Sequence, residues 1–251
     1  RPGYDFIIQG MGGIMSVTGE ADGLPQKSGV AIADIFTGTN AAVAILAALH
    51  RRTETGEGAF IDMALLDTQV GFLQAQALNF LVGGKTPVRM GNQHPNLAPY
   101  AVVVVADGHM ILATGNDAQF ARTCEVLGLA GMATDPRFLR NHDRLANREV
   151  MMALIGGRTA TFTKSDLLAK LEAAGVPVGP INTVPEVFQD PQVIHRRMKR
   201  DLPAPAAEGG TIPGVRSPYV VDGVAQCAPR PSPRLGEHQG EVLADPAWTG
   251  R

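Results

Sequence analysis

The chain has 251 residues, of which 45% are hydrophobic and 18% charged, and its formal net charge is -2 at pH 7. This composition indicates a soluble globular protein with a sizeable core, long enough for one large or two modest domains. The near-neutral charge and the lack of a basic block argue against nucleic acid as a partner.

Cysteines and apolar runs indicate the compartment. Cys124 and Cys227 lie far apart without metal-ligand spacing, so we interpret both as packing thiols in a reducing compartment. No secretory signal and no transmembrane run is recognised, and no HExxH, paired CxxC or EF-hand spacing occurs. We therefore expect a cytoplasmic protein that contacts no membrane, with no metal and no permanently bound cofactor.

The N-terminal part opens with residues 3–18, which mix apolar residues and glycines and predict a helix. They match neither phosphate-binding fingerprint, GxGxxG or GxxxxGK[ST]. Residues 35–49 are then apolar on nearly every face, which predicts a helix buried on all sides. Polar residues at 37–40 interrupt this run, and we expect it to be too short to span a bilayer.

A single acid, Asp34, precedes that apolar run. Asp is a favoured residue at helix N-termini, so one interpretation is a cap that accepts hydrogen bonds from the first free amides. The other is a working carboxylate that the same amides and the helix dipole keep ionised. The residues alone leave both interpretations open.

Residues 59–63 predict a short strand, and the apolar spacing from Leu66 to Phe80 predicts one helix that ends at Gly83-Gly84. This order is typical of an α/β layer. A proline-rich loop follows, and then a β-hairpin of residues 100–105 and 110–114 through Asp107-Gly108. Helices are expected from Asn116 to Gly128, over 141–155, and from Thr163 to Gly175, which together indicate a small α+β domain.

Residues 185–233 are rich in proline, with 204–210 the most linker-like part. Short pieces at 214–215 and 219–221 predict isolated strands, and residues 235–243 are compatible with a helix. His94 and His238 lie in loop-like segments and are the better candidates for function. The other histidines are interpreted as structural or solvated; they are His50, His109, His142 and His195.

Seven segments in chain order resemble the class III CoA-transferases, the CaiB/BaiF family, which includes formyl-CoA and succinyl-CoA transferases. They are RPGYDFIIQGMGGIMSVTGE (1–20), GVAIADIFTG (29–38), ALHRRTETGEGAFIDMALLD (48–67), GNQHPNLAPY (91–100), ADGHMILATGNDAQFARTCEVLG (106–128), AAGVPVGPINTVPEVFQDPQV (173–193) and LGEHQGEVL (235–243). The resemblance runs nearly from end to end. Members of the family use an aspartate in the second segment as nucleophile, and that position here is Asp34.

The resemblance implies CoA transfer from an acyl-CoA thioester to a carboxylic acid through an aspartyl-CoA thioester on Asp34. Carboxylate nucleophiles divide such an acyl exchange into easier covalent steps. Amides at the helix start beside Asp34 are expected to hold the oxyanions that develop. CoA is then a substrate, and a succinyl-CoA or similar short-chain dicarboxylate system is our expectation for the acyl group.

The family resemblance also implies residues that bind CoA or substrate. They are Tyr4, Asp5, Gly91, Asn92 and His94, the last three in a loop that we expect to act as a lid or substrate loop. An alternative is an α-methylacyl-CoA racemase, but those enzymes carry histidine where this chain has Tyr4, so the second proton-transfer base is missing. A non-catalytic CoA-binding chain is the third hypothesis.

For the fold, the resemblance implies an α/β protein with a Rossmann-like large domain and a small α+β domain. We assign residues 1–88 to the large domain with Asp34, 89–200 to the small domain, and 201–251 to a proline-rich linker and a return to the large domain. The family's N-terminal segment is absent and the chain begins without methionine, so the large domain is expected to be incomplete here. An interlocked homodimer is also expected.

Overall fold

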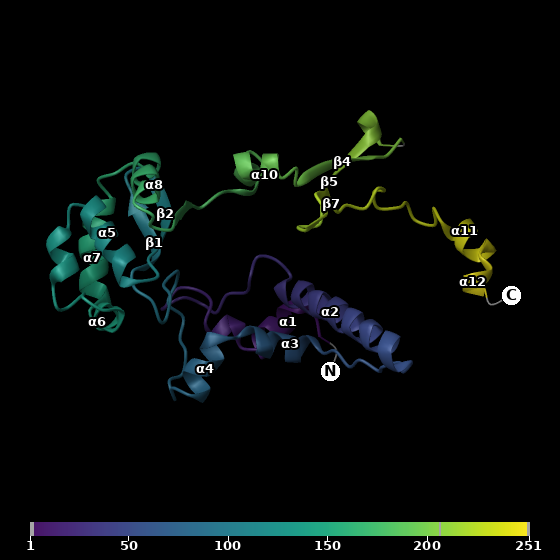
Figure 1. Ribbon diagram of the computed structural model, residues 1–251, viewed down its shortest axis with the longest axis horizontal. Coiled ribbons are helices and arrows are strands. Elements are labelled where there is room, and N and C mark those ends of the chain that lie inside the picture. Colours follow the sequence, from purple (N-terminus) through teal and green to yellow (C-terminus); the bar gives the residue numbers. More distant parts are fainter. Residues whose placement is uncertain (1–2, 206, 250–251) are drawn as a thin grey trace. The chain divides into compact units, whose positions relative to one another are not determined.

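The computed structural model describes residues 3–205 and 207–249, which belong to two compact units. The first unit runs to Pro180 and the second begins at Ile181 (Figure 1). The predictions for the first segment, the linker and the C-terminus each include residues outside this description, which are 1–2, 206 and 250–251.

The first part of the first unit is helical. Its elements are α1 (Asp5–Met11), the 3-10 helix η1 (Ile14–Ser16), α2 (Ile32–Thr55), α3 (Leu65–Phe72) and α4 (Ala75–Leu81). Helix α1 contacts α2 and α3, and α2 contacts α3 (Figure 1). The rings of Phe36 and Phe72 join α2 to α3 with their centroids 4.7 Å apart, a distance typical of aromatic pairs.

Helix α2 runs for 24 residues without a break. The polar residues at 37–40 do not interrupt it, because side chains there bond back to carbonyl groups of the preceding turn. Oγ1 of Thr37 donates to the carbonyl of Ala33 at 2.7 Å, and Nδ2 of Asn40 donates to the carbonyl of Phe36 at 2.9 Å. The prediction of an interrupted helix too short for a bilayer is therefore wrong.

The surface of α2 also differs from the prediction. Its only buried residues are Ala33 and Thr37, while Ile35 is 61% exposed and Leu46 is 66% exposed. The prediction of a helix buried on all sides is wrong, because no described element covers these apolar faces. By length and composition alone α2 is able to cross a membrane, a test that core helices of soluble proteins and signal sequences also pass.

Two further predictions for this part are wrong. Residues 59–63 form no strand, since a strand needs a neighbour for its ladder hydrogen bonds and the described residues offer none there. The single helix expected from Leu66 to Phe80 is divided between α3 and α4. Gln74 between them has a φ of 45°, which a residue in a right-handed helix does not adopt.

The rest of the first unit contains an antiparallel sheet in the order β1-β2-β3. Strands β1 (Tyr100–Val105) and β2 (Gly108–Ala113) form the predicted hairpin, and β3 (Val178–Pro180) pairs with β2. In the hairpin Val103 pairs with Met110, and both side chains are buried. The alternation of the two strands therefore directs one face of the sheet into a core.

Helices complete this core. They are α5 (Asp117–Val126), η2 (Ala130–Thr134), α6 (Asn141–Ala146), α7 (Arg148–Thr159) and α8 (Lys164–Ala173). Helix α7 contacts β1, and α8 contacts β2 and β3. We call the resulting cluster of buried residues the α+β core; its largest members are Phe120, Phe138, Met110, Leu112, Leu127, Met151, Ile155, Leu167 and Leu171.

The predicted starts of two helices are confirmed. The side chain of Asn116 accepts a hydrogen bond from the amide of Gln119 at the start of α5, and Thr163 accepts one from Asp166 at the start of α8. The helix expected over 141–155 is instead two helices, α6 and α7, that meet at Asn147. Asn147 ends the first because its ψ of 27° lies outside the helical range.

The second unit has short elements and little buried surface. Its elements are α9 (Val184–Val187), α10 (Pro191–His195), β4 (Lys199–Pro203), η3 (Glu208–Gly210), β5 (Thr211–Val215), β6 (Val220–Val221), β7 (Val224–Ala225), α11 (Gln239–Ala244) and α12 (Pro246–Thr249). Strands β4 and β5 pair antiparallel, as do β6 and β7. The described part of the segment predicted to be linker-like, 204–205 and 207–210, lies between β4 and β5. Among the described residues of this unit only Ala204 and Arg216 are buried.

The chain thus combines helices with antiparallel sheets, as an α+β small domain requires. Every strand pair in the described residues is antiparallel. The Rossmann-like large domain therefore stays a prediction, and so does the division at residues 88 and 200. The boundary between the two compact units, after Pro180, falls before the predicted end of the small domain.

Candidate active site

Asp34 lies in the first turn of α2. Its side chain is exposed and makes no hydrogen bond or ion pair with the described residues. An ionised carboxylate with both oxygens free has acceptor capacity to spare and electron density for attack on a carbonyl carbon. This position therefore suits a nucleophile.

The cap of α2 is supplied by Asp5, not by Asp34. The N-cap residue of α2 is Ala31, which has no side-chain acceptor. Oδ1 of Asp5 accepts hydrogen bonds from the amides of Ala33 at 2.8 Å and of Asp34 at 3.3 Å. The interpretation of Asp34 as an N-cap is therefore wrong. The backbone amide of Asp34 donates to the carboxylate of Asp5 in α1, and the carboxylate of Asp34 itself stays free.

The same contacts correct the expected oxyanion site. The amide of Ile32 donates to the carbonyl of Val30 at 2.8 Å, and those of Ala33 and Asp34 donate to Asp5. All these amides already have acceptors, so they are not free to hold a developing oxyanion. The prediction that the helix-start amides do so is wrong for this arrangement.

Gln9 and Ser28, which the sequence interpretation missed, join α1 to the segment before α2. Nε2 of Gln9 donates to Oδ2 of Asp5 at 2.6 Å, and Oε1 of Gln9 accepts from the amide of Ser28 at 2.8 Å. The side chain of Gln9 is fully buried. The signal in the sequence is the four-residue spacing of Asp5 and Gln9, which places both on one face of a helix.

Tyr4 directly precedes α1 as its N-cap residue and is 81% exposed. Its carbonyl accepts the amide of Ile8 at 3.0 Å. The structure therefore brings Asp5 into contact with the segment of Asp34 and leaves the Tyr4 ring open to solvent. CoA binding by Tyr4 and Asp5 stays a prediction.

The loop with Gly91, Asn92 and His94 is held by other parts of the first unit. The amide of Gly91 donates to the carbonyl of Gly19 at 3.0 Å, and Asn92 is exposed. Gly91 has a φ of 58°, and a side chain there would meet the carboxylate of Glu20 at 2.8 Å. Among the described residues no hydrogen bond joins this loop to Asp34 or Asp5, so the structure does not bring these predicted site residues together.

His94 is held from several sides. Its Nδ1 accepts the amide of Asn96 at 3.0 Å, its carbonyl accepts Nη1 of Arg148 at 2.8 Å, and its ring lies 5.1 Å from that of Tyr100. Burial and, second, the charge of Arg148 lower the pKa of His94 below its ordinary value. The imidazole is therefore neutral near pH 7 and serves as a hydrogen-bond acceptor.

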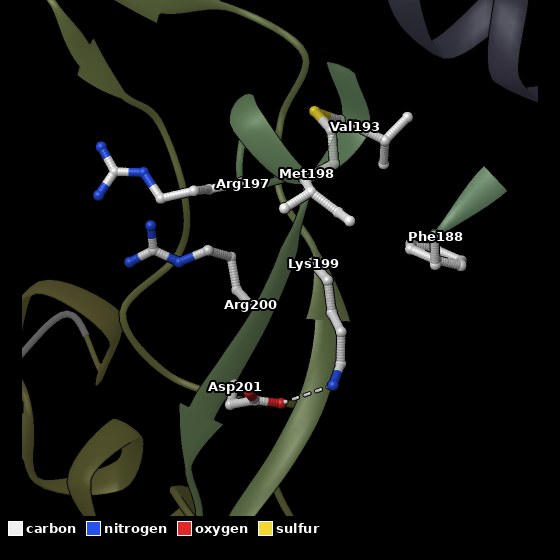
Figure 2. A pocket seen from close by; sticks show the side chains of 8 residues that line it. Phe188, Val193, Arg197, Met198, Lys199, Arg200 and Asp201 are labelled. Carbon is white, nitrogen blue, oxygen red and sulfur yellow. Dashed lines mark ion pairs between the residues drawn. The ribbon is translucent and has the colours of Figure 1, made fainter. Parts of the chain in front are cut away.

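Two cavities are lined by other residues. One, of about 810 Å³, lies between α4, the following loop, Leu145 and Arg148. The other, of about 460 Å³, belongs to the second unit, where Figure 2 shows Arg197 and Arg200 in its lining and an ion pair between Lys199 and Asp201. Nζ of Lys199 lies 3.5 Å from Oδ1 of Asp201. Neither cavity is lined by a predicted site residue. Among the described residues no cluster of histidine, cysteine and acidic side chains is suited to a metal ion.

Comparison with known proteins matches residues 1–239 to the profile of CoA-transferase family III. A succinate–glutarate CoA-transferase of Agrobacterium fabrum is 50% identical, over 97% of this chain and 60% of its own length. A succinyl-CoA:glutarate CoA-transferase of Mus musculus is 36% identical, over 98% of this chain and 56% of its own length.

Among solved structures, the crystal structure of a CaiB/BaiF family protein from Brucella suis superposes with a TM-score of 0.79 at 50% identity. The match covers 97% of this chain and 63% of that one. The chain therefore spans less than two thirds of the length of each of these relatives.

Proposed function

Since the chain belongs to CoA-transferase family III, we propose that in its full-length form it moves CoA from an acyl-CoA thioester to a carboxylic acid. The acids we propose are succinate and glutarate. The support for this choice is the relative from Agrobacterium fabrum, which is named for that pair and is 50% identical. Differences of one methylene are discriminated by only about 1–3 kcal/mol, so neighbouring dicarboxylates are also expected to react.

The proposed reaction proceeds through covalent intermediates on Asp34. An oxygen of its carboxylate attacks the thioester carbonyl of succinyl-CoA, the C–S bond breaks, and a mixed anhydride and CoA thiolate result. The thiolate then attacks the aspartyl carbonyl, which releases succinate and leaves CoA as a thioester of Asp34. Glutarate reverses both steps and leaves as glutaryl-CoA, so that Asp34 is regenerated without net uptake of protons or electrons.

One observation carries this proposal: the Asp34 carboxylate is exposed and without a partner in the described residues, although it stands at a helix start where acids commonly cap. The capping is done by Asp5, which leaves Asp34 available for attack. Tyr4 stands where the racemases carry a histidine base, and a phenol has no imidazole nitrogen to accept the proton from the α-carbon.

The test uses the full-length protein with succinyl-CoA and glutarate. We expect succinate and glutaryl-CoA as products and, without glutarate, a CoA adduct on the peptide that contains Asp34, found by mass spectrometry. Asp34→Ala should abolish the adduct and lower the transfer rate by at least about 1,000-fold. Glu54→Ala removes an exposed acid from the last turn of the same helix and should leave both unchanged.

Full transfer activity of Asp34→Ala would refute the covalent mechanism. The racemase alternative predicts deuterium uptake from solvent at the α-carbon of a 2-methylacyl-CoA without any exchange of the acid. CoA binding in calorimetry without turnover would instead support the non-catalytic hypothesis. The homodimer stays a proposal that rests on the family resemblance. The cytoplasmic location and the absence of a membrane partner stay proposals that rest on the amino-acid sequence.

A further inference from the structure

We propose that Asp5 is a positioning residue for Asp34, and that Gln9 orients the Asp5 carboxylate. The inference rests on the proposed function, in which Asp34 is the nucleophile. Oδ1 of Asp5 accepts the amides of Ala33 at 2.8 Å and of Asp34 at 3.3 Å. One carboxylate oxygen therefore holds the peptide groups on both sides of the Ala33 α-carbon.

Gln9 fixes the other oxygen of that carboxylate. Its Nε2 donates to Oδ2 of Asp5 at 2.6 Å, while its Oε1 accepts the amide of Ser28 at 2.8 Å. The Gln9 side chain is buried, with 0% of its surface exposed. This buried amide has one orientation, because a flip would turn its NH2 group toward the Ser28 amide and its oxygen toward the Asp5 carboxylate. Gln9 thus joins α1, the segment before α2, and the cap into one network.

The network replaces a cap that α2 lacks in its own sequence. Ala31, the N-cap residue, offers no side-chain oxygen to the free amides of the first turn. A carboxylate in this position also complements the positive end of the helix dipole. Because the amide that Asp5 binds belongs to Asp34, the cap fixes the backbone from which the nucleophile projects.

This placement matters for the chemistry more than for stability. Attack on a thioester carbonyl requires a carboxylate oxygen within about 3–3.5 Å and aligned, and a displacement of 1 Å costs roughly 100-fold in rate. Loss of the cap frees the first turn of α2, where both contacts of Asp5 lie. Both oxygens of Asp5 are already bonded within the protein, so substrate affinity should change little when Asp5 is replaced.

The experiment measures transfer from succinyl-CoA to glutarate by full-length Asp5→Ala, Asp5→Asn and Gln9→Leu variants. Gln9→Leu leaves Oδ2 of Asp5 without its donor, so its kcat should lie between those of wild type and Asp5→Ala, and a wild-type kcat would refute the role of Gln9. For Asp5→Ala we expect kcat to fall roughly 10- to 100-fold while KM for succinyl-CoA stays within about twofold. The occupancy of the CoA adduct on Asp34 should fall with kcat. Asp5→Asn retains an acceptor for the amides but turns an NH2 group toward Gln9, so its kcat should be intermediate.

Asp190→Ala is the matched control. Oδ1 of Asp190 accepts the amides of Gln192 and Val193 at the start of α10, so this variant loses a cap of the same kind elsewhere. It should keep the wild-type kcat.

An unchanged kcat in Asp5→Ala, or an equal loss in Asp190→Ala, would overturn the proposal. If Asp5→Ala does not fold, as judged by circular dichroism, Asp5→Asn decides: wild-type kcat and adduct occupancy would overturn the proposal, and an intermediate kcat would support it. Full transfer activity of Asp34→Ala would refute the role of Asp34 as nucleophile, on which this inference rests, whereas an inactive Asp34→Ala with a fully active Asp5→Ala would refute only the positioning role.

Discussion

Arg144 is a charged side chain inside the α+β core, with 1% of its surface exposed. Its Nε donates to the carbonyl of Ala98 at 2.7 Å, Nη1 to that of Phe138 at 3.0 Å, and Nη2 to Oδ1 of Asp117 at 2.8 Å. The guanidinium carbon also lies 4.6 Å from the centroid of the Phe120 ring. A buried charge is tolerated when its donors are paired in this way, and Arg144 so ties the segment before β1 to α5.

The carboxylate of Asp117 should make the stability of this core depend on pH. The hydrogen bond from Arg144, and a second one from Arg140, hold the pKa of Asp117 below its ordinary value. A group whose pKa is lower in the folded state contributes stability above its unfolded pKa of about 3.9, and loses it as the pH falls through the folded pKa.

We therefore expect Asp117→Asn to lower the free energy of unfolding at pH 7 and to reduce its decline below pH 4. Urea unfolding followed by circular dichroism from pH 7 to pH 3 measures both effects. Asp166→Asn is the control, since it breaks an exposed ion pair with Lys170 that contributes little. Parallel pH curves for wild type and Asp117→Asn would contradict the prediction.

At the scale of elements, the sequence predicted best what is local. The hairpin β1–β2 follows from alternating residues around Asp107-Gly108, and the caps Asn116 and Thr163 follow from side chains next to the amides that they bind. The prediction of a strand at 59–63 was wrong because a strand also needs a partner strand, and residues distant in the sequence decide whether one is present. The prediction of one helix in place of α3 and α4 was wrong because apolar spacing alone does not reveal the positive φ of Gln74.

The candidate site shows the same limit. Asp34 was found from its place before an apolar run and from the family resemblance, and its side chain is free as a nucleophile requires. The alternative interpretation of Asp34 as the cap of α2 is wrong, because Asp5 reaches the start of α2 from another helix. Such a tertiary contact leaves no pattern in the sequence around the helix that it caps.

Helix α2 is long and apolar enough to span a membrane, yet we expect the chain to stay in the aqueous phase. Insertion would break the bonds from Asp5 to the first turn and the Phe36–Phe72 contact with α3. In flotation with phosphatidylcholine vesicles the 251-residue chain should remain at the bottom of the gradient. If the unchanged chain floats and the Leu46→Lys variant does not, the exposed face of α2 enters the bilayer instead.

At the scale of the whole molecule, buried surface is distributed unequally. The α+β core lies within the first unit, from Ala98 to Val176. The second unit buries only Ala204 and Arg216 among its described residues. Regions with few buried apolar contacts open at a lower free energy than a packed core, so the two units should differ in local stability.

Limited proteolysis should reveal this difference. Trypsin cleaves after arginine and lysine. In the second unit its exposed sites include Arg196 and Arg197, on the segment that joins α10 to β4, and Lys199, the first residue of β4. We expect the earliest cuts after Arg196, Arg197 and Lys199 and late cuts within 101–176, because the core must unfold first there. Mass spectrometry of a time course identifies the fragments, and a variant with glutamine at these three positions should lose the early cuts. Equal rates of cleavage at Arg122 or Arg158, which lie in α5 and α7, would show that the α+β core opens as readily as the second unit.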